Sequence, residues 1–195
     1  MKYYIEISLI DNSDFNLFSL WSKVFQQIHL GLVEMQDDQG RVPIGVSFPE
    51  YVTGEKYSVL GGKLRLFAAD EATLAKFDAA KWLSRLSDYV HCTSIRAVPE
   101  KLTGYAIYQR EQPKTNKERL ARRYAKRHNI SYDAALEQYG EIAYKNIASP
   151  FIRLQSLSGG QTFCLWVKKS LVSVPVDSVT YSRYGLSSLA TVPEF

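Results

Sequence analysis

The stretch Lys2-Tyr-Tyr-Ile-Glu-Ile-Ser-Leu-Ile10 decides how the first half of the chain folds. Apolar side chains recur at every second position, which is typical of a β-strand with one buried face: Tyr3, Ile5, Ile7 and Leu9. Asn12-Ser-Asp14 then supplies residues that commonly begin a helix. Apolar side chains follow at helical spacing, so we expect a helix from about Asp14 to Glu34.

The same alternation of strands and helices continues to about residue 100. We expect three further strands, over Arg41–Phe48, Lys63–Ala69 and Asp88–Val98. Between the last two, Asp70 caps a helix that runs through Trp82. The order βαββαβ resembles the ferredoxin-like arrangement, a four-stranded antiparallel sheet with two helices on one face. The sequence therefore predicts an α+β fold, with a ferredoxin-like domain over residues 1–100.

Residues 101–195 have a different pattern. Tyr105–Gln112 is expected to be extended, and a basic helix to follow from about Asn116 to His128. Thr115 as the N-cap and Glu118 three residues later fit a capping box at its start. Ser131 is expected to cap a second helix, which Gly140 ends.

A β-hairpin is expected after these helices. Strands over Phe151–Leu157 and Gln161–Lys168 would be joined at Ser158-Gly-Gly160, because glycines accept the positive φ of a hairpin turn. The tail over residues 179–195 is expected to be irregular. Residues 101–195 are thus predicted to form a second region with a basic helix and a β-hairpin.

Composition excludes several classes of protein. Aromatic residues make up 13% of the chain, which disfavours disorder, and no apolar run is long enough to span a membrane. Met1–Ile10 lacks the pattern of a secretory signal. Cys92 and Cys164 are too few for a disulfide framework. These observations predict a cytoplasmic protein with no membrane partner.

The positive charge is concentrated in one segment. Between Arg110 and His128 lie eight cations and two acids, whereas the net charge of the whole chain is only +4. Like charges at helical spacing repel one another, and a nucleic acid backbone would relieve that repulsion. Arginine also pairs in a bidentate way with phosphate or guanine. We therefore predict that the helix binds a structured RNA and that residues 101–195 form an RNA-binding region.

Three other interpretations of the basic helix stay open. It could be a solvated surface face, part of a DNA-binding regulator, or a membrane-surface helix. The last fits worse because Leu120 and Tyr124 give only a thin apolar strip. An RNA hairpin is favoured over a long duplex because the deep groove of A-form RNA is narrow except near the end of a stem or a loop.

The residues offer few catalytic groups. Neither HExxH nor CxxC is present, and no close acidic cluster would hold two metal ions, so we expect neither a metal nor a cofactor. His29 follows Phe18 and Phe25 at the rim of an apolar helix face, although spacing alone leaves a structural role open. RNA carries its own nucleophile, the 2′-hydroxyl, so one histidine and a few positioning groups can support cleavage.

Taken together, five segments resemble the CRISPR repeat-processing endoribonucleases of type I-F (Csy-subtype) systems. The resemblance covers nearly the whole chain and rests on the order and spacing of these segments: a helical His29, Ile44-Gly-Val-Ser-Phe-Pro49, Asn116-Lys-Glu-Arg-Leu-Ala-Arg-Arg-Tyr-Ala-Lys-Arg-His128, Ser156-x-Ser158-Gly-Gly-Gln161-x-Phe163 and Tyr184-Gly-Leu-Ser187.

The resemblance implies roles for particular residues. His29 falls at the family's catalytic histidine, Ser156 at a serine that positions the ribose 2′-hydroxyl, and Tyr184 at a tyrosine near the histidine. Phe163 matches an aromatic that stacks under the last base pair of the stem. Arg110 and Gln112 match readers of base edges, and Arg123, Lys126 and Arg127 match basic residues that enter the groove. The charge pattern of the segment adds Lys114, Arg119 and Arg122 to the expected RNA-binding residues.

The resemblance further implies an activity and partners. The expected reaction is metal-independent cleavage of precursor crRNA at the base of the repeat stem-loop, leaving a 2′,3′-cyclic phosphate and retaining the product within a type I-F RNA-guided complex. The alternative is a non-catalytic, hairpin-binding subunit of such a complex. The sequence departs from the family at Lys117, Lys126 and Leu157, where the family has proline, arginine and a polar residue.

Overall fold

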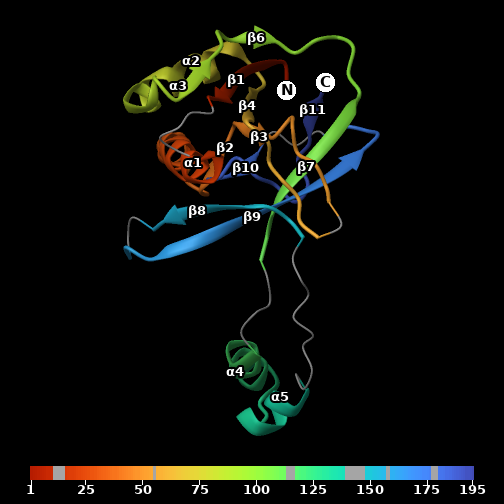
Figure 1. The fold of residues 1–195 in the computed structure, drawn as a ribbon. Coiled ribbons are helices and arrows are strands. Elements are labelled where there is room, and N and C mark those ends of the chain that lie inside the picture. Colours follow the sequence, from red (N-terminus) through yellow and green to blue (C-terminus); the bar gives the residue numbers. More distant parts are fainter. Residues whose placement is uncertain (11–15, 55, 113–116, 139–147, 157–158, 177–179) are drawn as a thin grey trace. The chain divides into compact units, whose positions relative to one another are not determined.

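The computed structural model describes residues 1–10, 16–54, 56–112, 117–138, 148–156, 159–176 and 180–195 (Figure 1). The fold is mixed α+β with several antiparallel sheets. Contacts divide the chain into two compact units, Met1–Glu111 with Ser149–Phe195, and Gln112–Ala148. This division differs from the expected boundary at residue 100, because strands on both sides of the basic helix belong to the larger unit. No helix among the described residues is long and apolar enough to cross a membrane.

The N-terminal sheet is built around β1 (Tyr3–Leu9), as the alternation of its residues predicted. It pairs with β4 (Lys63–Ala68) on one side and with β5 (Val90–Cys92) and β6 (Arg96–Ala97) on the other. The strand β3 (Gly45–Ser47) pairs with β4, giving the order β3-β4-β1-β5. All these pairs are antiparallel.

The helix α1 (Leu17–Glu34) carries the apolar stripe that buries against this sheet. Its N-cap is Asn16, whose side chain accepts a hydrogen bond from the Ser19 amide at 2.8 Å, and the expected start at about Asp14 lies outside the described residues. Asp70 caps α2 (Glu71–Phe77) as predicted. That helix is interrupted at Asp78, whose φ of 50° ends α2 and whose side chain caps α3 (Ala79–Trp82); the 3₁₀ turn η1 (Ser84–Leu86) follows.

Two of the expected strands are each split in two. The first becomes β2 (Arg41–Val42) and β3, separated at Pro43, which has no amide to donate to a sheet. The second becomes β5 and β6. Between them the hydroxyl of Thr93 accepts the hydrogen bond from the Glu6 amide at 3.0 Å, in place of a backbone carbonyl, and the regular ladder is interrupted there.

A second antiparallel sheet has the order β11-β7-β9-β8. It contains β7 (Gly104–Glu111), β8 (Phe151–Gln155), β9 (Thr162–Val172) and β11 (Val192–Glu194). The predicted hairpin of β8 and β9 is confirmed, and β9 runs four residues beyond Lys168 because it pairs with β7 from Tyr105 to Glu111. The tail is not irregular: β10 (Tyr181–Ser182) pairs with β2, and β11 pairs with β7.

The smaller unit holds the helices α4 (Lys117–His128) and α5 (Tyr132–Gln138). Ser131 caps α5, since its hydroxyl accepts a hydrogen bond from the Ala134 amide at 3.2 Å. Ala121 and Ala135 are buried where the two helices pack. The expected cap at Thr115, the helix start at Asn116, the stop at Gly140 and the strand end at Leu157 lie outside the described residues.

Candidate active site

His29 lies in the second half of α1, next to the buried Ile28. Its Nδ1 is 2.8 Å from the carbonyl oxygen of Arg183. Because a carbonyl oxygen only accepts hydrogen bonds, the neutral imidazole carries its proton on Nδ1. The lone pair of Nε2 is then available to take a proton from another group. The contact thus selects the tautomer that a general base requires.

The ring of Tyr184 holds the same imidazole from one face. The two ring centroids are 4.4 Å apart, with 14° between the planes, which is a stacked arrangement. Tyr184 belongs to a turn in which the Gly185 amide donates to the Ser182 carbonyl at 2.7 Å. The carbonyl of Gly185 accepts from the Val46 amide at 2.9 Å, which fixes the turn against β3.

Gly185 is required in this turn for two reasons. Its φ is +68°, which L side chains rarely adopt, and a Cβ atom there would come within 2.4 Å of Cγ1 of Val46. The glycine therefore allows the close approach that places the Arg183 carbonyl and the Tyr184 ring beside α1.

The pKa of His29 is lowered from its ordinary value of 6.5. The largest cause is burial, which disfavours the charged imidazolium, and the positive charge of Arg183 acts in the same direction. The hydrogen bond to the Arg183 carbonyl opposes both by stabilising the protonated form. At neutral pH the imidazole is therefore mainly neutral, as a proton acceptor must be.

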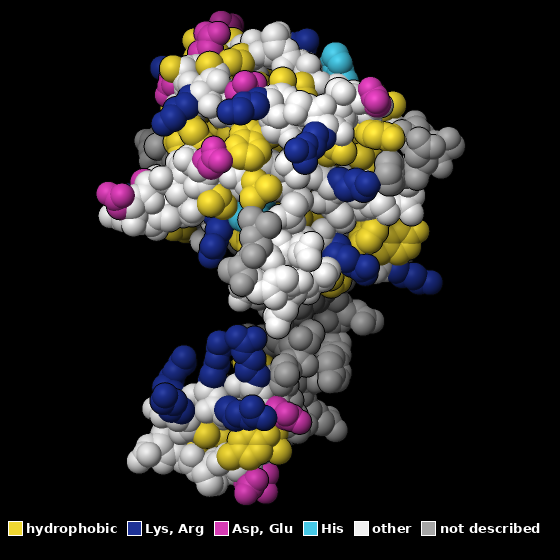
Figure 2. All heavy atoms as spheres, turned by 90° about the vertical axis from the view of Figure 1, so that its left-hand side faces the viewer, with side chains coloured by type: hydrophobic (Ala, Val, Ile, Leu, Met, Phe, Trp, Pro, Cys, Tyr) yellow, Lys and Arg dark blue, Asp and Glu magenta, His cyan; other side chains and the backbone are white. Residues whose placement is uncertain are grey.

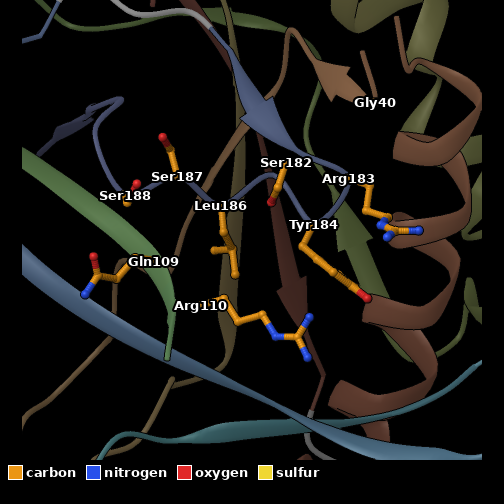
Figure 3. Close-up of a pocket in the computed structure, with 9 residues that line it drawn as sticks. All are labelled: Gly40, Gln109, Arg110, Ser182, Arg183, Tyr184, Leu186, Ser187 and Ser188. Carbon is orange, nitrogen blue, oxygen red and sulfur yellow. The ribbon is translucent and has the colours of Figure 1, made fainter. Parts of the chain in front are cut away.

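Arg110 and Phe163 extend this cluster from the second sheet. The Arg110 guanidinium carbon lies 5.6 Å from the Tyr184 ring centroid and 5.7 Å from that of Phe163. The rings of Phe163 and Tyr184 meet edge to face at 6.4 Å. Arg110 and Tyr184 line one cavity of about 530 Å³, together with Arg183 and Ser187. Figure 3 shows these side chains. Arg110 and Phe163 thus both contact Tyr184, the residue whose ring stacks on the imidazole.

Ser156 follows β8 and is half-buried. Its amide donates to the Gln161 carbonyl and its carbonyl accepts from the Gly160 amide, both at 2.8 Å, which closes the hairpin end. The main-chain N–H of the preceding Gln155 donates a hydrogen bond to Oε1 of Gln26 at 3.0 Å. Because Gln26 lies one helical turn before His29, this bond brings the end of β8 beside the turns of α1 that lead to the imidazole.

The predicted cations on α4 are exposed: Arg119, Arg122, Arg123, Lys126 and Arg127. Figure 2 shows dark-blue side chains gathered on this small unit. Arg122 pairs with Glu118 at 3.5 Å within the helix, and His128 packs on Tyr124 with centroids 4.1 Å apart. Gln112 is described and exposed, whereas Lys114 lies outside the described residues. These residues belong to the smaller unit, and the candidate active site lies wholly in the larger one.

Sequence reasoning missed two residues that shape the site, Arg183 and Gln26, and it quoted Gly185 within a motif without assigning it a role. The Arg183 contact runs through its main-chain carbonyl, which no side-chain pattern reveals. Gly185 after two polar residues was a detectable turn signal. Within the described part of the chain, no three His, Cys, Asp or Glu side chains converge as a metal site.

The larger unit is thus an α+β scaffold with a neutral imidazole, held by a carbonyl and an aromatic stack, beside an arginine-lined cavity. These features define a protein with a candidate acid–base site. The family model described as CRISPR-associated protein (Cas_Csy4) matches residues 4–195, so the chain belongs to the Cas6/Csy4 family.

Two relatives agree with this assignment over their full length. The CRISPR-associated endonuclease Cas6/Csy4 of Escherichia coli (strain UTI89 / UPEC) is 33% identical over 196 residues, covering 100% of both chains. The protein of that name from Pseudomonas aeruginosa (strain UCBPP-PA14) is 33% identical over 195 residues, again covering 100% of both chains. A solved structure described as an RAMP protein binding different RNA substrates is 10% identical, covers 98% of this chain and 99% of its own, and has a TM-score of 0.37.

Proposed function

We propose that this protein is a metal-independent endoribonuclease that binds the hairpin of a CRISPR repeat and cuts precursor crRNA at the base of the stem. The observation that carries the proposal is the environment of His29: Nδ1 bonded to a carbonyl, one face stacked on Tyr184, and the pKa lowered. Membership of a CRISPR-associated endonuclease family supports the choice of substrate. The ferredoxin-like order of the N-terminal strands is the proposed scaffold for this histidine.

In the proposed reaction, Nε2 of His29 accepts the proton of a ribose 2′-hydroxyl. The freed 2′-oxygen attacks the adjacent phosphorus, and the bond from phosphorus to the 5′-oxygen of the next nucleotide breaks. That oxygen takes up a proton and leaves as a 5′-hydroxyl, while the upstream product ends in a 2′,3′-cyclic phosphate. Ser156 holds the ribose, and Tyr184 keeps the imidazole in the orientation for attack.

Recognition of the RNA is assigned to the cations and to one aromatic. Phe163 stacks under the last base pair of the stem, and the neighbouring Arg110 reads a base edge, as does Gln112. The exposed arginines of α4 bind the groove and the backbone. The protein then stays on its product as a cytoplasmic subunit of a type I-F RNA-guided complex.

The nucleophile is tested with a labelled repeat hairpin in excess EDTA. Cleavage should continue in the chelator and stop when a single 2′-deoxy nucleotide precedes the scissile phosphate, because the attacking oxygen is then missing. The deoxy hairpin should still bind. Normal cleavage of the deoxy hairpin would show that the 2′-hydroxyl is not the nucleophile.

His29→Ala tests the base. Loss of an acid–base group typically lowers the cleavage rate by a factor on the order of 10²–10⁴, whereas hairpin affinity and melting temperature should change little. His91→Ala is the matched control, since His91 is exposed on β5 in the N-terminal sheet. Absence of cleavage by the wild-type protein, with tight hairpin binding, would favour the non-catalytic binding subunit instead.

A further inference from the structure

A second cavity, of about 460 Å³, lies where α1 faces β8 and η1. Figure 1 shows α1 next to β8, and Gln26 and Gln155 join the two through a hydrogen bond. The cavity shares no residue with the one beside Tyr184. Its lining includes three cations from three different elements and no acidic side chain: Lys23, Arg85 and Arg153.

The cations are placed for a ligand that carries negative charge. Arg85 and Arg153 are exposed, and neither forms an ion pair with a carboxylate in the part of the chain that the structure describes. Amide side chains of Gln26, Gln27 and Gln155 lie among them. Guanidinium groups beside neutral amides suit a phosphodiester backbone with polar bases attached.

An aromatic ring adjoins the cavity. The Arg153 guanidinium carbon lies 5.7 Å from the ring centroid of Phe18, and Phe18 packs edge to face on Phe151 at 5.3 Å. Phe18 is nevertheless 41% exposed, although it lies one turn before Ser22, which lines the cavity. An exposed ring next to arginine is the usual platform on which proteins stack the bases of single-stranded RNA.

Gln26 adds an unsatisfied donor. Its Oε1 accepts the hydrogen bond from the Gln155 amide, but its Nε2 is buried and has no acceptor among the described residues. Buried polar groups normally have partners, so this nitrogen calls for an acceptor that a ligand would bring. A base carbonyl or a phosphate oxygen would meet that need.

The cavity borders the candidate active site. Along the axis of α1, Gln26 lies about 4.5 Å before His29, and Ser22 lies about 10 Å before His29. The imidazole contacts Tyr184, which lines the first cavity, and is one helical turn from Gln26, which lines the second. His29 is therefore the link between an aromatic cluster and a cationic groove.

We propose that this second cavity binds the first few nucleotides 3′ of the scissile phosphate. The inference rests on the proposed function, in which the stem stacks on Phe163. The strand beyond the cut must then leave His29 in a direction other than the stem. Arg85 and Arg153 bind its phosphates, Phe18 stacks a base, and Nε2 of Gln26 donates to it.

The test compares two RNAs with 2′-deoxy substitution at the nucleotide before the cut. One ends at the scissile phosphate, and the other continues for several unpaired nucleotides. The wild type should bind the extended RNA roughly five- to tenfold more tightly than the RNA that ends at the scissile phosphate. This gain is at the lower end of what one stacked base typically contributes. This gain should disappear in Arg85→Ala/Arg153→Ala and shrink in Phe18→Leu. The slope of log affinity against log salt concentration should become shallower by about 0.7 for each phosphate contact that is lost.

The control is Lys81→Ala/Arg96→Ala, which removes two exposed cations that line neither cavity. It should keep the full gain, and melting temperatures should show that all variants are folded. If the short hairpin binds the wild type but extension adds nothing, the inference is wrong and the proposed function stands. The inference also fails if the control loses the gain equally, or if the double variant keeps it. If even the short hairpin does not bind, both proposals fall.

Discussion

Replacing Tyr184 by alanine should change both the orientation and the titration of His29. The stacked pair, with centroids 4.4 Å apart, is of the kind that contributes about 0.5–1.5 kcal/mol beyond burial. If that energy holds the imidazole in its reactive orientation, its loss lowers the single-turnover rate roughly two- to tenfold. Tyr184→Phe keeps the ring and should cleave at nearly the wild-type rate.

Tyr184→Ala should also raise the pKa of His29 toward 6.5. Burial is the largest cause of the lowered pKa, and removing the ring admits water to one face of the imidazole. At about pH 8 the base is neutral in both proteins, so the rate ratio reports orientation alone. As the pH falls through about 6.5, the variant becomes protonated first, and the ratio of wild-type to variant rate should increase.

The lowered pKa of His29 should also make the free energy of unfolding depend on pH. A histidine with a lowered pKa in the folded protein leaves the free energy of unfolding unchanged above about pH 6.5 and reduces it as the pH falls through the folded-state pKa. The assay is a pH–rate profile with NMR titration of the three histidines, assigned by substitution. A rate ratio that is constant from about pH 5.5 to 8, or equal defects in Tyr184→Phe and Tyr184→Ala, would refute the reasoning.

Three further predictions address binding and folding. Arg123→Ala/Arg127→Ala should weaken hairpin binding and flatten its log–log salt dependence by roughly 0.7–0.9 per lost contact, with the melting temperature unchanged because both side chains are exposed; an unchanged slope would remove α4 from the interface. Gly185→Ala should lower the free energy of unfolding more than Gly160→Ala, which meets open space and bears only the positive-φ cost of about 1–2 kcal/mol; equal losses would contradict the predicted clash. Asn16→Ala should cost about 1 kcal/mol in urea unfolding, and no change would reject this residue as the cap of α1.

Local patterns were enough for much of the secondary structure. The period-two alternation of β1, the helical spacing in α1 and the two glycines of the β8–β9 hairpin each depend on neighbours within a few residues. The basic character of α4 is likewise a property of composition. Splits at Pro43 and Asp78 were harder to foresee, since each depends on how one residue's backbone meets the rest of the fold.

By itself the sequence determined most of the strands and helices outside the tail, where the charge is concentrated, and that His29 lies at the rim of an apolar helix face, because these follow from residue type and spacing. Only the tertiary structure decided which atom of His29 is free. The Arg183 carbonyl reaches the imidazole from 154 residues away along the chain, and the Tyr184 ring belongs to the next residue. Their approach depends on β10 pairing with β2 and on a turn that glycine alone accommodates against Val46. Such long-range contacts are selected by packing, which no local pattern encodes.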